Sequence, residues 1–275
     1  MSDRKQQEQT ACEQPVMMAG SHWMLELPLY INGKGPFPMS VDTGAGLTII
    51  LPDLADELGL DVVDSEERRG VGGSITIDIA EIQSATVEGI DAGLGTIGVS
   101  SFPKLLCGDS VRGNLGHDIL RHGRLTADFG SRRAAFEPSG PQPIDGTPFR
   151  IGNPKKPLII VQAVVNGAGP HSFAVDTGAM GTCISPRLAM ALGVDEGEPV
   201  QAAGVGGMME AFFSADLLEF RIGDRCAAEV RPAVLDVFDH LAPEAEVTLS
   251  GIIGRDILQN YVVTIDYPHS IIRFA

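Results

Sequence analysis

The feature that most constrains the fold of this chain is an internal duplication. The tetrapeptide Asp-Thr-Gly-Ala occurs at residues 42–45 and again at 176–179, an offset of 134 residues. An Asn-Gly pair lies ten residues upstream of each aspartate, beginning at Asn32 and Asn166. Two copies of one pattern predict two copies of one structural unit, related by a pseudo-two-fold axis.

The repeat continues well beyond the tetrapeptide. The offset of 134 also relates Pro52 to Pro186, and it relates the Gly-Val-Gly-Gly run at 70–73 to the same run at 204–207. After a length difference of four residues the offset becomes 138, which pairs Gly-His-Asp-Ile-Leu at 116–120 with Gly-Arg-Asp-Ile-Leu at 254–258. The duplication therefore covers most of the chain.

The two aspartates of the repeat, Asp42 and Asp176, are a chemical pattern as well as a structural one. A pseudo-two-fold axis places matched residues opposite one another, so we expect the two carboxyl groups within hydrogen-bonding reach. Two carboxylates at that distance cannot both ionise cheaply and share one proton. The charged member can polarise a water while the neutral member protonates a carbonyl oxygen, which is the chemistry of hydrolysis.

Each copy resembles a monomer of the retropepsin-like aspartic proteases, in the clan of pepsin and the retropepsins. The order in each copy is an entry strand, an apolar-Asp-Thr-Gly-Ala loop, a Gly-rich flap hairpin, an apolar-Gly-x-Asp-Ile-Leu helix start and a closing strand, over roughly residues 22–275. The resemblance implies an all-β, bilobal acid-protease fold with pseudo-two-fold symmetry, in which two retropepsin-like β-barrel lobes with short helices are fused in one chain.

The resemblance also implies a role for each motif residue. It makes the chain an aspartic endopeptidase that activates a water between Asp42 and Asp176 at the lobe interface. The residues expected to support the two active-site loops are Thr43, Gly44, Ala45, Thr177, Gly178 and Ala179. The residues expected in flaps that close over a bound peptide are Val71, Gly72, Gly73, Val205, Gly206 and Gly207.

Other interpretations of these motifs remain open. A single Asp-Thr-Gly is also an ordinary turn, and a Gly-rich run is also a plain β-turn. Gly-Val-Gly-Gly is not followed by Lys-Ser or Lys-Thr, which disfavours a phosphate loop. The same fold could be a catalytically silent or highly selective peptide-binding or processing module. Asp118 and Asp256 are expected to cap short helices.

Composition limits the partners. The 36 acidic and 20 basic residues give a net charge of −16, which disfavours nucleic acids and anionic membranes as partners. The six histidines show no metal-ligand spacing, and the four cysteines are expected to be free thiols. We therefore expect a peptide or protein substrate, no metal, no cofactor, and activity as a monomer.

The chain divides by composition. Residues 1–20 are polar and are expected to be a disordered tail, followed by a first lobe at 21–137, a Pro/Gly-rich linker at 138–148 and a second lobe at 149–275. The first residues lack the apolar segment of a signal peptide, which predicts a cytoplasmic protein, or a secreted or periplasmic one if a signal peptide was removed.

Overall fold

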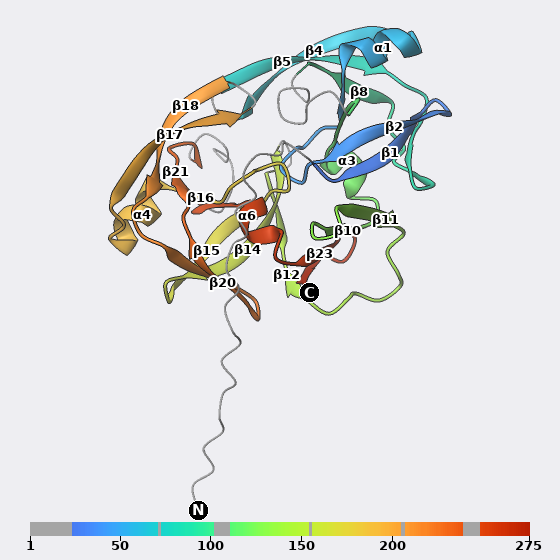
Figure 1. Cartoon of the computed structure of the whole chain (residues 1–275). Helices are drawn as coiled ribbons and strands as arrows, with labels where there is room; N and C mark the ends of the chain where they lie inside the picture. The colour runs from blue at the N-terminus through green and yellow to red at the C-terminus, as the bar shows by residue number, and fades with distance from the viewer. Residues whose placement is uncertain (1–23, 71–72, 102–110, 154–155, 205–206, 239–247) are drawn as a thin grey trace, which may run out of the picture.

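The computed structural model describes residues 24–70, 73–101, 111–153, 156–204, 207–238 and 248–275. The expected tail at 1–20 lies outside the described residues. The described part is mostly β-strand and forms two lobes, drawn in Figure 1 from blue to green and from yellow to red.

Within the described residues, the first lobe is built on a mixed sheet of nine strands. Their order across the sheet is β4-β5-β8-β3-β9-β2-β1-β6-β7. The bounds are β1 (Glu26–Ile31), β2 (Lys34–Val41), β3 (Ile49–Ile50), β4 (Val62–Gly70), β5 (Gly73–Glu81), β6 (Ala85–Val87), β7 (Ile90–Asp91), β8 (Thr96–Val99) and β9 (Gly113–Leu115).

The second lobe repeats this sheet strand for strand. Its order is β17-β18-β21-β16-β22-β15-β14-β19-β20, and β13 pairs with β14 in addition. The bounds are β13 (Arg150–Asn153), β14 (Lys156–Val165), β15 (Ala168–Val175), β16 (Cys183–Ile184), β17 (Glu196–Gly204), β18 (Gly207–Ser214), β19 (Leu218–Ile222), β20 (Arg225–Val230), β21 (Ala233–Val234) and β22 (Gly251–Ile253). The expected all-β, two-lobed fold is confirmed.

Matching turns set the register in both lobes. Asn32-Gly33 joins β1 to β2, and Asn166-Gly167 joins β14 to β15. All four residues have positive φ, between 49° and 77°. Two consecutive positive φ values make the type I′ turn, whose twist matches that of the flanking strands, and Asn-Gly is the favoured sequence for it. The Asn-Gly pairs therefore fix the hairpins that end at the two aspartates.

Short helices occupy matching places as well. They are α1 (Pro52–Leu58), α3 (His117–Leu120), α4 (Pro186–Leu192) and α6 (Arg255–Leu258). Proline begins α1 and α4, where its missing N–H costs nothing, and a left-handed glycine ends each of them, at Gly59 and Gly193.

A third sheet joins the lobes. Its order is β11-β10-β23-β24-β12, from β10 (Arg124–Asp128), β11 (Arg133–Glu137), β12 (Thr147–Pro148), β23 (Val262–Asp266) and β24 (Ile271–Phe274). Strand β10 of the first lobe pairs antiparallel with β23 of the second, with Leu125 opposite Ile265. Both side chains are fully buried in a core cluster that draws residues from both lobes. In Figure 1 this sheet lies below the long hairpins β4–β5 and β17–β18, which arch over the other side of the molecule.

Candidate active site

Each aspartate of the repeat lies at the end of a central strand. Asp42 follows β2 and Asp176 follows β15. In the first lobe β9 lies between β2 and β3 and pairs parallel with β2, so the chain leaves the sheet at Asp42 before it returns in β3. The second lobe repeats this arrangement with β15, β22 and β16. The sheet topology thus brings two equivalent loops to equivalent positions.

Backbone N–H groups hold each carboxylate within its own loop. Gly44 N donates to Asp42 Oδ1 at 2.9 Å, and Gly178 N donates to Asp176 Oδ1 at 2.7 Å. Ala179 N adds a second bond to Asp176 Oδ1 at 3.1 Å. These bonds fix the orientation of both side chains.

The two threonines bond across the lobe interface in a reciprocal pattern. Thr43 Oγ1 donates to Val175 O at 2.9 Å and accepts from Thr177 N at 3.0 Å. Thr177 Oγ1 donates to Val41 O at 2.8 Å and accepts from Thr43 N at 3.0 Å. Both threonines are buried, so these four bonds lock the loops to each other away from water.

Glycine is required beside each aspartate because the loops approach so closely. A Cβ on Gly44 would overlap the carboxyl group of Asp176, and one on Gly178 would lie 2.6 Å from Asp42 Oδ1. Each carboxyl group therefore lies against the glycine of the opposite loop. The two carboxyl groups are also hydrogen-bonded to each other.

This contact changes the acidity of the pair. Burial, together with the neighbouring charge of Asp176, raises the pKa of Asp42 to about 8. Burial also raises the pKa of Asp176, although the N–H groups of Gly178 and Ala179 oppose the rise. A carboxyl pair in this state retains one proton through neutral pH and can present a charged and a neutral oxygen together.

Asp118 and Asp256 each bond to the first turn of their own helix, as expected, but from inside that turn and not from the N-cap position. Asp118 Oδ1 accepts from Ile119 N and Asp256 Oδ1 accepts from Ile257 N, both at 2.9 Å. The residues before α3 and α6 are Gly116 and Gly254, and neither helix start has a side-chain cap. Asp118 Oδ1 also accepts from Thr48 Oγ1 at 2.6 Å and from Thr48 N at 2.9 Å.

The second lobe repeats this support with Asp256 and Thr182. Asp256 Oδ1 accepts from Thr182 Oγ1 at 2.7 Å and from Thr182 N at 2.8 Å. Each threonine also accepts from a glycine N–H, Gly116 at 3.0 Å and Gly254 at 3.1 Å. Because Thr48 and Thr182 are also related by the offset of 134, the repeat contained the signal that could have identified them.

No feature of the repeat identified Lys156, a cation whose charge acts on Asp176. Lys156 begins β14, and its charge lowers the pKa of Asp176. The residue 134 positions earlier is His22, so the repeat does not conserve a lysine there.

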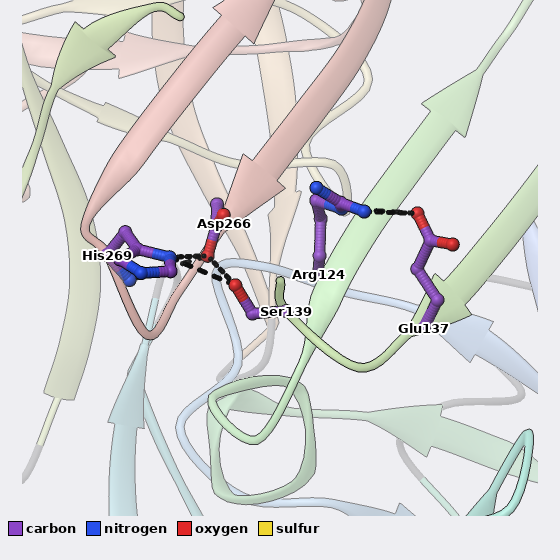
Figure 2. Close-up of polar contacts among 5 residues, drawn as sticks. All are labelled: Arg124, Glu137, Ser139, Asp266 and His269. Atoms are coloured by element: carbon purple, nitrogen blue, oxygen red, sulfur yellow. Dashed lines mark hydrogen bonds and ion pairs between the residues drawn. The ribbon is translucent and has the colours of Figure 1, made fainter. Parts of the chain in front are cut away.

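A serine, a histidine and an aspartate also meet near the end of β23. Figure 2 shows Ser139, Asp266 and His269 pointing toward one another. Ser139 Oγ donates to Asp266 Oδ1 at 2.7 Å, and His269 Nδ1 lies 3.1 Å from that same oxygen and 3.0 Å from Ser139 Oγ. In a catalytic triad the imidazole stands between the other two and uses a different ring nitrogen for each. This cluster instead ties the connector between the lobes to the end of β23, beside the Arg124–Glu137 ion pair at 3.0 Å.

The cysteines differ from the expectation of four free thiols. Cys226 is disulfide-bonded, which corrects that expectation. Cys183 is free and buried, and burial raises the pKa of its thiol to about 12, so it stays protonated and is a poor nucleophile. Within the described ranges, no cluster of three or more His, Cys, Asp or Glu side chains could hold a metal ion. None of the helices in the described part of the chain has the length and apolar character needed to cross a membrane.

The sequence profile of a family described as aspartyl protease matches the chain twice, over residues 27–118 and 161–257. The chain belongs to the aspartyl protease family. Each match contains one Asp-Thr-Gly-Ala loop, so the duplication consists of two copies of the family's domain. This membership supports a hydrolase that acts as a protease.

The overall fold is also that of a known aspartic proteinase. The structure is similar to the aspartic proteinase from Irpex lacteus, with a TM-score of 0.51 over 90% of this chain and 92% of that chain. The sequence identity is 13%, so the likeness concerns the fold alone. No curated protein matches this aspartyl protease in sequence.

The residues expected to form flaps are described only in part. Val71, Gly72, Val205 and Gly206 lie outside the described residues. Gly73 begins β5, where it pairs with Gly70, and Gly207 begins β18, where it pairs with Gly204. Gly70 and Gly73 therefore lie in one long antiparallel hairpin and Gly204 and Gly207 in another, and none of these four glycines begins a helix.

Proposed function

We propose that this aspartyl protease is an endopeptidase that hydrolyses peptide bonds with a water held between Asp42 and Asp176. The observation that carries the proposal is the hydrogen-bonded contact of two burial-shifted carboxyl groups, one from each copy of the family domain. Perturbed carboxyl pairs of this kind are typical of catalytic sites, where burial and a like charge keep one proton in place.

The proposed reaction uses the two protonation states together. The ionised carboxylate accepts a proton from the water as its oxygen attacks the peptide carbonyl carbon, and the neutral carboxyl group donates its proton to the carbonyl oxygen. The product of this step is a gem-diol with no covalent bond to the enzyme. Collapse of the diol breaks the C–N bond, and a carboxyl proton passes to the leaving amine. The cross-lobe threonine bonds support the proposal because they hold both carboxyl groups in a fixed geometry without reorganisation.

The proposed substrate is a peptide or protein segment in extended conformation. The hairpins β4–β5 and β17–β18 offer backbone groups to which such a segment could add as a strand. Because Asp42 and Asp176 belong to one chain, the proposed activity requires neither a second copy nor a cofactor. A binding module without catalysis would gain nothing from two buried carboxyl groups, because burying each of them costs folding free energy.

The decisive experiment is a peptide-library digest analysed by mass spectrometry. Asp42→Asn and Asp176→Asn should each lower kcat/KM by at least about 10²–10⁴-fold, because one amide removes either the shared proton or the negative charge. Asp53→Asn, on the exposed surface of α1, is the matched control and should cleave like the parent protein.

The outcome that contradicts the proposal is equally plain. Near-parental cleavage by either amide variant would show that the carboxyl pair is not the catalyst. Binding of peptides by the parent protein without any cleavage would favour the silent binding module.

A further inference from the structure

Lys156 makes a contact that joins the two lobes. It is the first residue of β14 in the second lobe, where it pairs with Asn153 of β13 and is half-buried. Its Nζ donates a hydrogen bond of 2.7 Å to the backbone carbonyl oxygen of Arg69. Arg69 lies near the end of β4, in the long β4–β5 hairpin of the first lobe. A single ammonium group therefore fastens the hairpin of one lobe to the other lobe.

The same ammonium group interacts with the pair electrostatically. Burial lowers the pKa of Lys156 to about 8, and the negative charge of Asp176 opposes that decrease. In return, the positive charge lowers the pKa of Asp176. Both pKa changes come from the attraction between the Lys156 ammonium group and the Asp176 carboxylate. Lys156 therefore stays cationic below about pH 8.

The lysine adds to an asymmetry that the backbone already creates. Asp176 Oδ1 accepts from Gly178 N and Ala179 N, and these bonds lower the pKa of Asp176 more than the charge of Lys156 does. The interaction of the lysine is with Asp176, whereas the pKa of Asp42 is raised by burial and by the charge of Asp176. A cation on one side of two carboxyl groups favours negative charge on the nearer one. The same arrangement favours the remaining proton on Asp42.

We propose that Lys156 is a positioning residue that fastens the β4–β5 hairpin to the second lobe and, together with the N–H groups of Gly178 and Ala179, keeps the negative charge of the pair on Asp176. This inference rests on the proposed function and deepens it by assigning the roles. Asp176 is the base that accepts the water proton, and Asp42 is the acid that donates to the peptide carbonyl oxygen. Lys156 acts through these residues and does not touch the reacting atoms.

Other titratable groups near the pair do not supply this charge. Burial and the charge of Asp42 raise the pKa of Tyr267, and burial with the charge of Asp176 raises that of Cys183. Both groups remain neutral over the working range. The side chain of Arg69 is exposed, and the bond uses its backbone oxygen.

The test compares the pH dependence of kcat/KM for the parent protein and four variants of the full chain. Lys156→Met removes both the charge and the donor, so the acidic limb should move up by about 1 pH unit and KM should rise. Lys156→Gln keeps a donor without the charge and should show the shifted limb with a smaller change in KM. Lys156→Arg keeps the charge and should restore the parental acidic limb. Lys34→Met, an exposed lysine of β2, is the control and should match the parent.

A second readout does not depend on activity. The carboxyl ¹³C shifts of Asp42 and Asp176, followed by NMR, should show Asp176 ionising at lower pH than Asp42 in the parent protein. In Lys156→Met the ionisation of Asp176 should move to higher pH by about the same amount as the kinetic limb.

The outcomes separate this inference from the proposed function. A uniform loss of kcat/KM in Lys156→Met and Lys156→Gln with an unmoved acidic limb would reduce Lys156 to a structural contact and overturn the inference alone. Ionisation of Asp42 before Asp176 would overturn the assignment of roles. If the parent protein cleaved no peptide, or if Asp42→Asn cleaved as fast as the parent, the proposed function would be overturned. The NMR titration would still show which of Asp42 and Asp176 ionises first.

Discussion

At the scale of single residues, the carboxyl pair makes stability depend on pH. The folded chain binds a proton on Asp42 up to about pH 8, whereas an unfolded aspartate releases its proton near its ordinary pKa of 3.8. Between these values the folded state binds more protons than the unfolded state. The free energy of unfolding therefore decreases as pH rises through this window, by roughly 1.4 kcal/mol per pH unit for one proton.

We predict that Asp42→Asn flattens this dependence. The amide has no proton to release, so the variant should lose less stability than the parent between about pH 4 and pH 8. Chemical denaturation at a series of pH values measures the slope. Asp118 and Asp256, whose pKa values burial also raises, contribute equally to both proteins and cancel in the comparison. Parallel slopes for parent and variant would show that Asp42 holds no extra proton when folded.

At the scale of elements, the loops after β2 and β15 are connected by the threonine bonds rather than by packing alone. Thr43 Oγ1 both donates to Val175 O and accepts from Thr177 N. The hydroxyl of one loop thus satisfies two buried backbone groups near the other. An apolar side chain of the same shape would fill the space and leave both groups without a partner.

We predict that Thr43→Val lowers the free energy of unfolding by about 1–3 kcal/mol, because it leaves the buried N–H of Thr177 without a hydrogen-bond acceptor. Thr177→Val should cost a similar amount, and the double variant should cost less than the sum since both remove parts of one network. Denaturant unfolding gives these values, and kcat/KM should fall with the loss of loop alignment. Additive costs in the double variant would argue that the loops do not act as one unit.

At the scale of the whole molecule, the two lobes share a sheet and a core. Strands β10 and β23 pair between the lobes, and the largest core cluster takes residues from both. Neither lobe can lose its structure without exposing the edge strand and apolar side chains of the other. The chain should therefore unfold as one cooperative unit despite its two copies of one domain.

We predict a single unfolding transition by calorimetry, and we predict that Ile265→Ala destabilises both lobes together. Ile265 is fully buried opposite Leu125 of the other lobe, and removing its side chain should cost about 2–5 kcal/mol. Amide hydrogen exchange in β1 and β14 should accelerate to the same extent. Met190→Ala, at a side chain that is 80% exposed, is the control. Two separate transitions, or faster exchange in one lobe alone, would contradict a shared core.

The repeated unit can be read directly from the linear chain. The offset between the two Asp-Thr-Gly-Ala loops predicted two lobes of matching topology, and the strand orders of the two large sheets agree with it. Local chemistry was sufficient here: Asn-Gly requires a tight turn, and proline and glycine mark the ends of α1 and α4. Such signals depend on neighbouring residues and are therefore visible in a linear chain.

Only the tertiary structure decided how the copies meet. Thr48 and Asp118 are 70 residues apart, and Lys156 and Arg69 are 87 apart. The Asp118 side chain accepts from Ile119 N in its own helix, and folding brings Thr48 to the same carboxylate oxygen. No sequence pattern predicted the contact of Lys156, because its partner is a backbone oxygen, which every residue type carries. Contacts of this kind depend on where the sheets place two segments, and that placement follows from the packing of the whole chain rather than from any local pattern.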